Sequence, residues 1–317
     1  MSELPATSQL TVVFVVGPTA SGKTALALAL ARRFAGEIVN ADSRAFYRGM
    51  DIGTAKPAVA ERAAAPHHLI DVADPDEVCS LGWFLERART ALADIARGGR
   101  LPLVVGGTGQ YIRALTEGWD PPHVPPDPEF RALLERRITA EGLPALAAEL
   151  RRLDPPAAAR IDVKNPRRVV RALEVALNPS GRRTESRPAP RPRALILGIF
   201  IERDELYRRI DARVDSMFEA GLVEEVRGLL AAGYDCSLSA FSAIGYREVC
   251  DLLRGDLTLE EARSRTKLNT HRLARTQAAW FRRSDPRITW LDAGPGLTDA
   301  AVDAVRTFLE TAPPTTE

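Results

Sequence analysis

The chemistry of this chain is most visible at residues 17–24, which read G-P-T-A-S-G-K-T and follow a short apolar run at residues 12–16. In such a loop the backbone N–H groups turn inward on an anion, the lysine reaches a terminal phosphate and the final hydroxyl holds Mg²⁺. An Ala/Leu-rich run follows, so the loop is predicted to end at a helix N-terminus, where phosphates bind well. The predicted phosphate-binding residues are Gly17, Pro18, Thr19, Ala20, Ser21, Gly22, Lys23 and Thr24, with Thr24 as the metal ligand.

The alternative is a glycine-rich turn that happens to contain a lysine, but the complete spacing in a strand–loop–helix context favours phosphate binding. The motif does not identify the phosphate compound. Nucleoside triphosphatases, kinases and some transferases all use the same cradle.

A second candidate is Asp42, which with Ser43 follows a predicted strand at residues 37–41. Ligands of open α/β sheets bind at the carboxyl ends of strands, so a reactive carboxylate belongs there. Asp-Ser also serves as a helix cap or a turn, and both interpretations remain open. Residues 44–57 are predicted to form an irregular loop that overhangs the site.

Another glycine-rich turn, G-G-T-G at residues 106–109, follows the apolar strand predicted at 101–105. It is either a close approach to a ligand or simply a tight turn. The strand does not end in the aspartate with which many triphosphatases complete their Mg²⁺ site. Asp71 is a weak substitute, and the pair His67 and His68 has no second ligand cluster at a recognisable spacing, so a structural or surface role is favoured.

Composition places the chain among globular proteins. Its 317 residues are 45% hydrophobic and 27% charged, and no apolar run approaches the roughly 20 residues of a membrane span. Residues 1–9 do not resemble a signal peptide, so we expect a cytoplasmic protein without membrane association. Three scattered cysteines predict buried free thiols rather than a disulfide framework, namely Cys79, Cys236 and Cys250.

The pattern of elements predicts an α/β fold: a parallel sheet flanked by helices, of the kind found in P-loop NTPases, with an inserted small helical domain. Residues 1–119 and 194–317 form the core, and residues 120–193 form the insertion. Helical periodicity in the insertion covers residues 130–138, 143–153 and 169–177, and a proline-rich basic stretch at 182–193 closes it. Downstream, residues 204–230 are predicted to form a long amphipathic helical region.

Although the net charge is only +1, it is unevenly spread. Residues 120–193 hold 15 basic against 10 acidic residues, and residues 263–287 hold 8 against 1. A helix predicted at 259–283 places its arginines over about a quarter of its circumference. These are Arg265, Arg272, Arg275 and Arg282. A solvated helix would mix charge signs, so contact with nucleic acid is favoured over a merely solvated face.

Together these segments resemble the bacterial tRNA dimethylallyltransferase family, also called tRNA isopentenyltransferases or IPP transferases. The resemblance runs from about residue 12 to about residue 290. Beyond the phosphate loop it includes A-D-S from Ala41, Y-R-G-M-D-I-G-T-A-K-P from Tyr47, P-H-H-L-I-D from Pro66, G-G-T-G from Gly106, R-A-L-E-V from Arg171 and A-I-G-Y-R-E from Ala243. Residues 51–57 make it specific, because ordinary kinases share only the loop.

The resemblance implies transfer of a dimethylallyl group from dimethylallyl diphosphate to the exocyclic amine of the adenosine 3′ of the anticodon. Asp42 would be the general base, and Lys23, Thr24 and Mg²⁺ would stabilise the departing diphosphate. Arg203, Arg209 or Arg213 would add a charge there, and the sequence does not choose among them. The residues expected to contact the tRNA anticodon stem-loop are Asp42, Ser43, Arg44, Ala45, Thr108, Arg131, Arg272 and Arg275.

Two other functions remain alternatives. A P-loop kinase of small molecules would not need the basic helix, and a non-catalytic RNA-binding protein would leave the phosphate loop and Asp42 unused. We expect a monomer.

Overall fold

The computed structural model describes residues 10–122, 124, 127–178 and 189–311. The chain forms two compact units, one of Met1–Gly118 with Pro190–Glu317 and the other of Trp119–Ala189. The second unit and the predicted insertion overlap over residues 120–189. The predictions for residues 1–9, and for most of the basic stretch at 182–193, lie outside the described residues.

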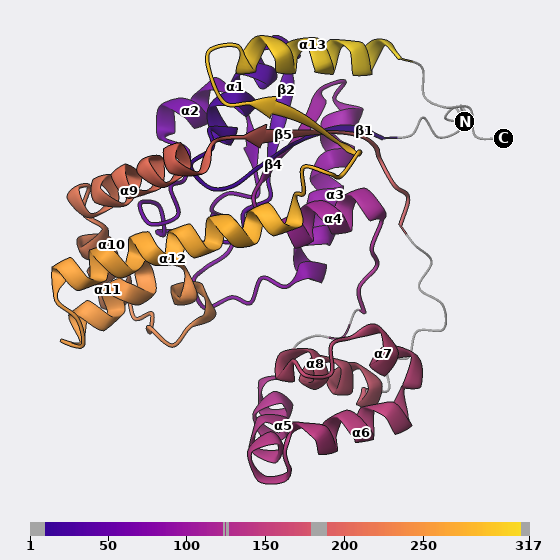
Figure 1. The fold of residues 1–317 in the computed structure, drawn as a ribbon, viewed down its shortest axis with the longest axis vertical. Coiled ribbons are helices and arrows are strands. Elements are labelled where there is room, and N and C mark those ends of the chain that lie inside the picture. The colour runs from indigo at the N-terminus through magenta and orange to yellow at the C-terminus, as the bar shows by residue number, and fades with distance from the viewer. Residues whose placement is uncertain (1–9, 123, 125–126, 179–188, 312–317) are drawn as a thin grey trace. The chain divides into compact units, whose positions relative to one another are not determined.

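Six parallel strands form one sheet in the order β3-β2-β4-β1-β5-β6 (Figure 1). They are β1 (Thr11–Val16), β2 (Gly36–Asn40), β3 (His67–His68), β4 (Leu101–Gly106), β5 (Arg193–Phe200) and β6 (Ile288–Asp292). The valine-rich β1 is buried on both faces, as a central parallel strand must be. Val16 pairs with Gly106 and Asn40 with Val105, so β1, β2 and β4 end at one edge of the sheet. The predicted α/β fold class is confirmed.

Helices cover both faces of this sheet (Figure 1). On one face α1 (Lys23–Arg33) and α13 (Leu297–Glu310) enclose a core that includes Val13, Val15 and Leu103. The other face carries α3 (Leu81–Arg97) and α4 (Gly109–Glu117). There the rings of Phe84 and Tyr111 stack with centroids 4.0 Å apart. Helices therefore cover both faces of the sheet, and the edge formed by the carboxyl ends of the strands is the part available for ligand binding.

The helical region predicted at 204–230 consists of two helices, α9 (Arg203–Glu219) and α10 (Leu222–Ala231). The break has a local cause. Gly221 has a φ of 98°, a left-handed conformation that glycine adopts readily and that ends a helix. The elements around and after it are α2 (Val59–Ala64), a short 3₁₀ turn (Ser239–Ser242), α11 (Tyr246–Leu253) and α12 (Leu259–Trp280), which packs against α9.

The second unit is helical, as predicted. Its elements are α5 (Pro128–Glu141), α6 (Leu143–Leu153), α7 (Pro155–Arg160) and α8 (Pro166–Leu177). Three of them begin with proline behind a side-chain cap, from Asp127, Asp154 and Asn165. Leu134, Leu146, Leu150, Val169 and Leu173 form a separate core.

The prediction of free thiols is wrong for two cysteines, because Cys236 and Cys250 form a disulfide. The chain folds back through the 3₁₀ turn, which brings their Cα atoms within 6.1 Å, and spacing along the sequence cannot reveal such an approach. Cys79 is free and half-buried. Among the described residues, no helix is long and apolar enough to cross a membrane.

Candidate active site

The loop at residues 17–24 joins β1 to α1, as its motif predicted. Gly17, Ala20 and Gly22 have φ values of 149°, 64° and 97°, so the backbone is bent into conformations that favour glycine. A Cβ added at Gly22 would meet nothing within 4 Å. The hydroxyl of Ser21 is buried without a hydrogen-bond partner among the described residues. The loop therefore presents open space and an unsatisfied polar group, as an anion site would.

Lys23 folds back over this loop and donates from Nζ to the carbonyl of Pro18 at 2.7 Å. Burial lowers the pKa of Lys23 from 10.5 to about 8, with Asp42 opposing this shift and Arg213 adding to it. A buried ammonium disfavoured in this way gains most from a neighbouring anion. The electrostatics of the loop thus favour a negatively charged ligand.

Asp42 is held firmly at the end of β2 by its neighbour Asn40. The Asn40 amide accepts from the backbone N–H of Asp42 at 3.0 Å and donates to the carbonyls of Asp42 and Leu69. Asp42 Oδ1 accepts from the backbone N–H of Arg44 at 2.9 Å, which makes a turn rather than a helix cap. The carboxylate still lines the site, so its turn role and a chemical role are compatible.

Two cavities meet at this carboxylate. The first is lined by the phosphate-loop residues Lys23 and Thr24, and the second by Ser43, Arg44 and Thr108. The residues that line both cavities are Thr19, Asp42, Thr54, Ala55 and Arg213. Asp42 therefore stands between a space beside the loop and a space beside the candidate RNA-contact residues.

Of the three arginines that the sequence left open, Arg213 is the one at the loop. Its Nη1 lies 3.5 Å from the Thr19 hydroxyl, and it lines both cavities. Arg209 instead pairs with Glu205 at 2.7 Å, and the guanidinium of Arg203 lies over the Tyr207 ring. Geometry thus selects Arg213 as the cation that can reach a bound anion.

The second glycine-rich turn, residues 106–109, is filled by the protein itself. A Cβ at Gly106 would lie 2.3 Å from the carbonyl oxygen of Ala41, and one at Gly107 would lie 2.2 Å from Nε2 of Gln277. At Gly109 it would lie 2.2 Å from Cγ of Trp280. These glycines leave room for Ala41, which follows β2, and for two side chains of α12. Within the turn, Oγ1 of Thr108 accepts from the backbone N–H of Ser43 at 3.3 Å, which further fixes the segment beside Asp42.

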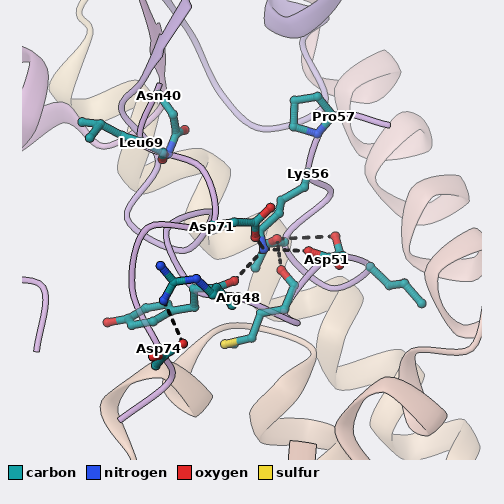
Figure 2. Close-up of polar contacts among 12 residues, drawn as sticks. Asn40, Arg48, Asp51, Lys56, Pro57, Leu69, Asp71 and Asp74 are labelled. Atoms are coloured by element: carbon teal, nitrogen blue, oxygen red, sulfur yellow. Dashed lines mark hydrogen bonds and ion pairs between the residues drawn. The ribbon is translucent and has the colours of Figure 1, made fainter. Parts of the chain in front are cut away.

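The wall segment Thr54–Ala55 belongs to the predicted overhanging loop, and Lys56 anchors it from one side (Figure 2). The Lys56 side chain is 1% exposed, and its Nζ contacts Oδ1 of both Asp51 and Asp71, at 2.6 and 2.5 Å. It also donates to the carbonyl of Tyr47 at 2.5 Å. Three oxygen partners compensate the cost of burying this ammonium, so Lys56 stabilises the loop and is not free to contact a ligand in the cavity.

From the other side the loop is held by Glu225 of α10. This carboxylate accepts backbone N–H bonds from Asp51, Ile52 and Gly53 and the hydroxyl of Tyr246. Asp71, the weak candidate for a metal-binding acid, is occupied by Lys56 and Arg62, whose hydrogen bonds and charges outweigh burial and lower its pKa. It serves the loop.

The histidine pair contacts two neighbouring groups of the protein. His68 Nε2 lies 2.7 Å from a carboxylate oxygen of Glu37, and His67 Nδ1 contacts the carbonyl of Ala65. Within the described ranges no group of three or more His, Cys, Asp or Glu side chains could hold a metal ion. The contact with Glu37 gives His68 a structural role, whereas Nε2 of His67 is buried without a hydrogen-bond partner among the described residues.

The candidate RNA-contact residues fall into different environments. Arg272 is exposed on α12, whereas Arg275 donates to the hydroxyl of Tyr207 on α9 at 3.0 Å. Ala45 is buried and lines the first cavity rather than the second. In the second unit, Arg131 makes a bidentate pair with Glu174, a carboxylate with only 2% exposure. The bond to Glu174 gives Arg131 a structural role there.

Sequence reasoning missed Asn40, Gln277 and Glu225. Their only signals were a polar side chain at the end of an apolar strand and two polar residues in helical segments, none of which indicates a site. Each acts on a segment distant in sequence: Gln277 accepts from the backbone N–H of Thr19 at 2.8 Å, across 258 positions.

Residues 45–284 match the model of the IPP transferase family. A tRNA dimethylallyltransferase of Roseiflexus castenholzii is 52% identical over 294 residues, which are 92% of this chain and 96% of the relative. One from Thermomicrobium roseum is 53% identical over 283 residues, 89% of this chain and 86% of the relative.

Solved structures agree. The full-length tRNA isopentenylpyrophosphate transferase of Bacillus halodurans matches with a TM-score of 0.69 and 39% identity, over 95% of this chain and 96% of the other. A eukaryotic dimethylallyltransferase acting on tRNA matches with a TM-score of 0.81 and 26% identity, over 97% of this chain and 81% of the other.

Proposed function

The chain belongs to the IPP transferase family and is a prenyltransferase that acts on tRNA, and we propose that dimethylallyl diphosphate is its donor. In this reaction the exocyclic amine of the adenosine 3′ of the anticodon attacks the allylic carbon, the carbon–oxygen bond to diphosphate breaks, and the amine loses a proton. The observation that carries the assignment of roles is the position of Asp42 in the walls of both cavities.

In this proposal the first cavity receives the diphosphate. Thr19, Lys23, Thr24 and Arg213 line the space in which negative charge grows as the leaving group departs. Donors that are already fixed before reaction stabilise such charge without reorganisation. Binding of the anion also offsets the burial that lowers the pKa of Lys23.

The donor set fits Mg²⁺ held chiefly by the substrate. Thr24 lines the cavity beside Lys23 and offers a hydroxyl oxygen, a hard ligand that suits this ion. Bound there with diphosphate, Mg²⁺ would supply further charge neutralisation for the leaving oxygen. Thr24 would orient the complex, while Lys23 and Arg213 act from the protein side.

Asp42 is the proposed general base. Asn40 fixes its backbone, Arg44 N–H occupies Oδ1, and no described residue donates to Oδ2, which is thus available for the amine proton. The adenine must leave its stack to reach this carboxylate, at an expense of a few kcal/mol that is smallest in an unpaired loop. Ser43, Arg44 and Thr108 line the second cavity along that approach.

We extend the proposal to the setting of the reaction: a monomer that works in the cytoplasm, with RNA contacts from Arg272 and from the helical unit. The basic side chains of α12 and of the helical unit would contact the phosphate backbone of the tRNA, since phosphate contacts dominate the affinity of most complexes with nucleic acids.

One experiment tests the function against its alternatives. Purified protein is incubated with unmodified tRNA, labelled dimethylallyl diphosphate and, as competing donor, ATP. Transfer of label to tRNA from the prenyl donor alone supports the proposal. Phosphate transfer from ATP would identify a kinase, and tight tRNA binding with no transfer would identify an RNA-binding protein.

A further inference from the structure

Gln277 is a buried amide that touches both glycine-rich turns at once. Its side chain belongs to α12, the residue is 7% exposed, and its Oε1 accepts from the backbone N–H of Thr19 at 2.8 Å. Its Nε2 occupies the place that a Cβ of Gly107 would need. A buried polar side chain is tolerated when its hydrogen-bonding groups are satisfied, and here one partner is the phosphate loop itself.

The opposite side of the same helix faces solvent. Ala262, Thr266, Ala274 and Gln277 are the buried residues of α12, whereas Arg265 and Arg272 are exposed. Trp280, one turn after Gln277, fits over Gly109. The exposed side of α12 therefore carries the candidate RNA-contact arginines, and its buried side packs against the phosphate loop.

We propose that Gln277 is a positioning residue that fixes the first half of the phosphate loop and makes donor binding depend on how α12 is seated. The inference rests on the proposed function, because it assigns the diphosphate to the loop and the tRNA to α12. Thr19 is held at two atoms, its backbone by Gln277 and its hydroxyl by Arg213. A shift of α12 on RNA binding thus reaches the loop through a single hydrogen bond.

Gln277→Met keeps the length of the side chain but removes the acceptor and leaves the Thr19 N–H unpaired. Loss of such a buried hydrogen bond is expected to weaken diphosphate binding about tenfold. The readout is the affinity for inorganic diphosphate with Mg²⁺, measured by calorimetry with and without unmodified tRNA, so no catalytic step is needed.

Asn269→Ala is the matched control. Asn269 is also an amide on α12, but it donates to Glu248 at 2.7 Å, accepts from Arg272 at 3.1 Å and does not contact the loop, so the two variants are compared without tRNA. This variant should lose thermal stability and keep its diphosphate affinity within about twofold. An equal loss of diphosphate affinity in both variants would overturn the inference, since general loosening of α12 would then explain it.

A second variant displaces the Gln277 amide by changing the residue that it packs against. Gly107→Ala adds a Cβ where Nε2 of Gln277 lies, so it should displace the amide and reproduce the loss. The double variant should lose no more than either single one, because both break one interaction. Additive losses would contradict the proposal.

The link to RNA is tested by the ratio of diphosphate affinities with and without tRNA. We expect tRNA to change this affinity in the wild type and not in Gln277→Met, since coupling between two sites is a measurable factor. The same ratio in both proteins overturns the coupling. If the wild type transfers no prenyl group while Gln277→Met still weakens diphosphate binding, the proposed function fails and this inference stands.

Discussion

Two glycine-rich turns leave neighbouring strands of the same sheet and have opposite interiors. Residues 17–24 follow β1 and residues 106–109 follow β4, and each leads into a helix, α1 or α4. At the first turn Gly22 faces open space and the Ser21 hydroxyl lacks a partner among described residues. At the second, every glycine is pressed against Ala41, Gln277 or Trp280.

The comparison teaches that glycine serves two purposes that a sequence does not distinguish. In the first turn it permits left-handed backbone beside open space. In the second it removes a Cβ so that other parts of the protein can approach closely. Variants of the first turn should therefore lose prenyl transfer before stability, whereas variants at Gly106 and Gly109 of the second turn should lose stability first.

The largest expected effect on the rate of prenyl transfer is at Asp42. Thr108 of the second turn bonds the neighbouring Ser43, and Asp42 lines the cavity beside the first turn. Asp42→Asn keeps nearly the same shape and can still accept from Arg44 N–H, but it cannot accept the amine proton. Single-turnover transfer should slow by about 10²–10⁴-fold. The melting temperature and donor affinity should change little, whereas a nearly normal rate would remove Asp42 from the mechanism.

Lys23→Ala tests the first turn directly. Removing a preorganised positive charge from the leaving group should lower the rate of prenyl transfer by about 10²–10³-fold. Affinity for tRNA should remain close to that of the wild type, because Lys23 lines only the cavity beside the loop. Equal loss of tRNA binding, measured by filter retention, would contradict this division of roles.

The lowered pKa of Lys23 predicts how the first turn responds to pH. In the free protein the ammonium begins to lose its proton near pH 8, so affinity for dimethylallyl diphosphate should fall by about tenfold per unit above that value. The contribution of Lys23 to the free energy of unfolding has the opposite trend. It rises between about pH 8 and 10.5, where the unfolded chain binds more protons than the folded one.

Titration of donor affinity by calorimetry checks this. Lys23→Arg is the matched control because a guanidinium keeps its charge over this range, and its profile should be flat near pH 8. A profile that falls equally in both proteins would assign the titration to another group.

Gly109→Ala tests the second turn. The new Cβ would lie 2.2 Å from Trp280, so α12 must shift, and overpacking of this kind destabilises by about 1–3 kcal/mol. Thermal melts should show the loss. Trp280→Gly added to Gly109→Ala should remove the clash, because the Cβ of residue 280 would itself lie 2.4 Å from the new Cβ. A clash that persisted in the double variant would assign the glycine to another purpose.

The smallest effect is expected at the exposed face of α12. Arg272→Ala should weaken tRNA binding slightly and reduce the slope of log affinity against log salt by about one at most. Arg275→Ala offers a comparison, since its guanidinium also bonds Tyr207 and its loss should lower the melting temperature as well. Unchanged affinity and slope for Arg272→Ala would make this face merely solvated.

The sequence predicted those features whose residues are contiguous. Residues 17–24 contain their own turn chemistry, and the strand pattern placed Asp42 at a carboxyl end. It could not predict the contact of Gln277 with Thr19 or of Glu225 with residues 51–53, because these depend on how α10 and α12 pack. It also could not choose Arg213 over Arg209, since the geometry of α9 relative to the loop decides which side chain reaches Thr19.

The position of the helix break at Gly221 and the Cys236–Cys250 disulfide were not predicted, and the reasons are related. A single glycine within an amphipathic run either continues or ends a helix, and the surrounding packing determines which. The disulfide requires that α11 return toward the end of α10, a tertiary arrangement that no spacing rule contains.

The hydrogen bond between Thr19 and Gln277 also has a consequence for biosynthesis. A ribosome that adds about 5–20 residues per second needs roughly 13–50 s to travel the 258 positions between them. For most of that interval the nascent chain already contains residues 17–24 but not α12, which begins at Leu259. The hydrogen bond that fixes the backbone of Thr19 therefore forms only after most of α12 has been synthesised.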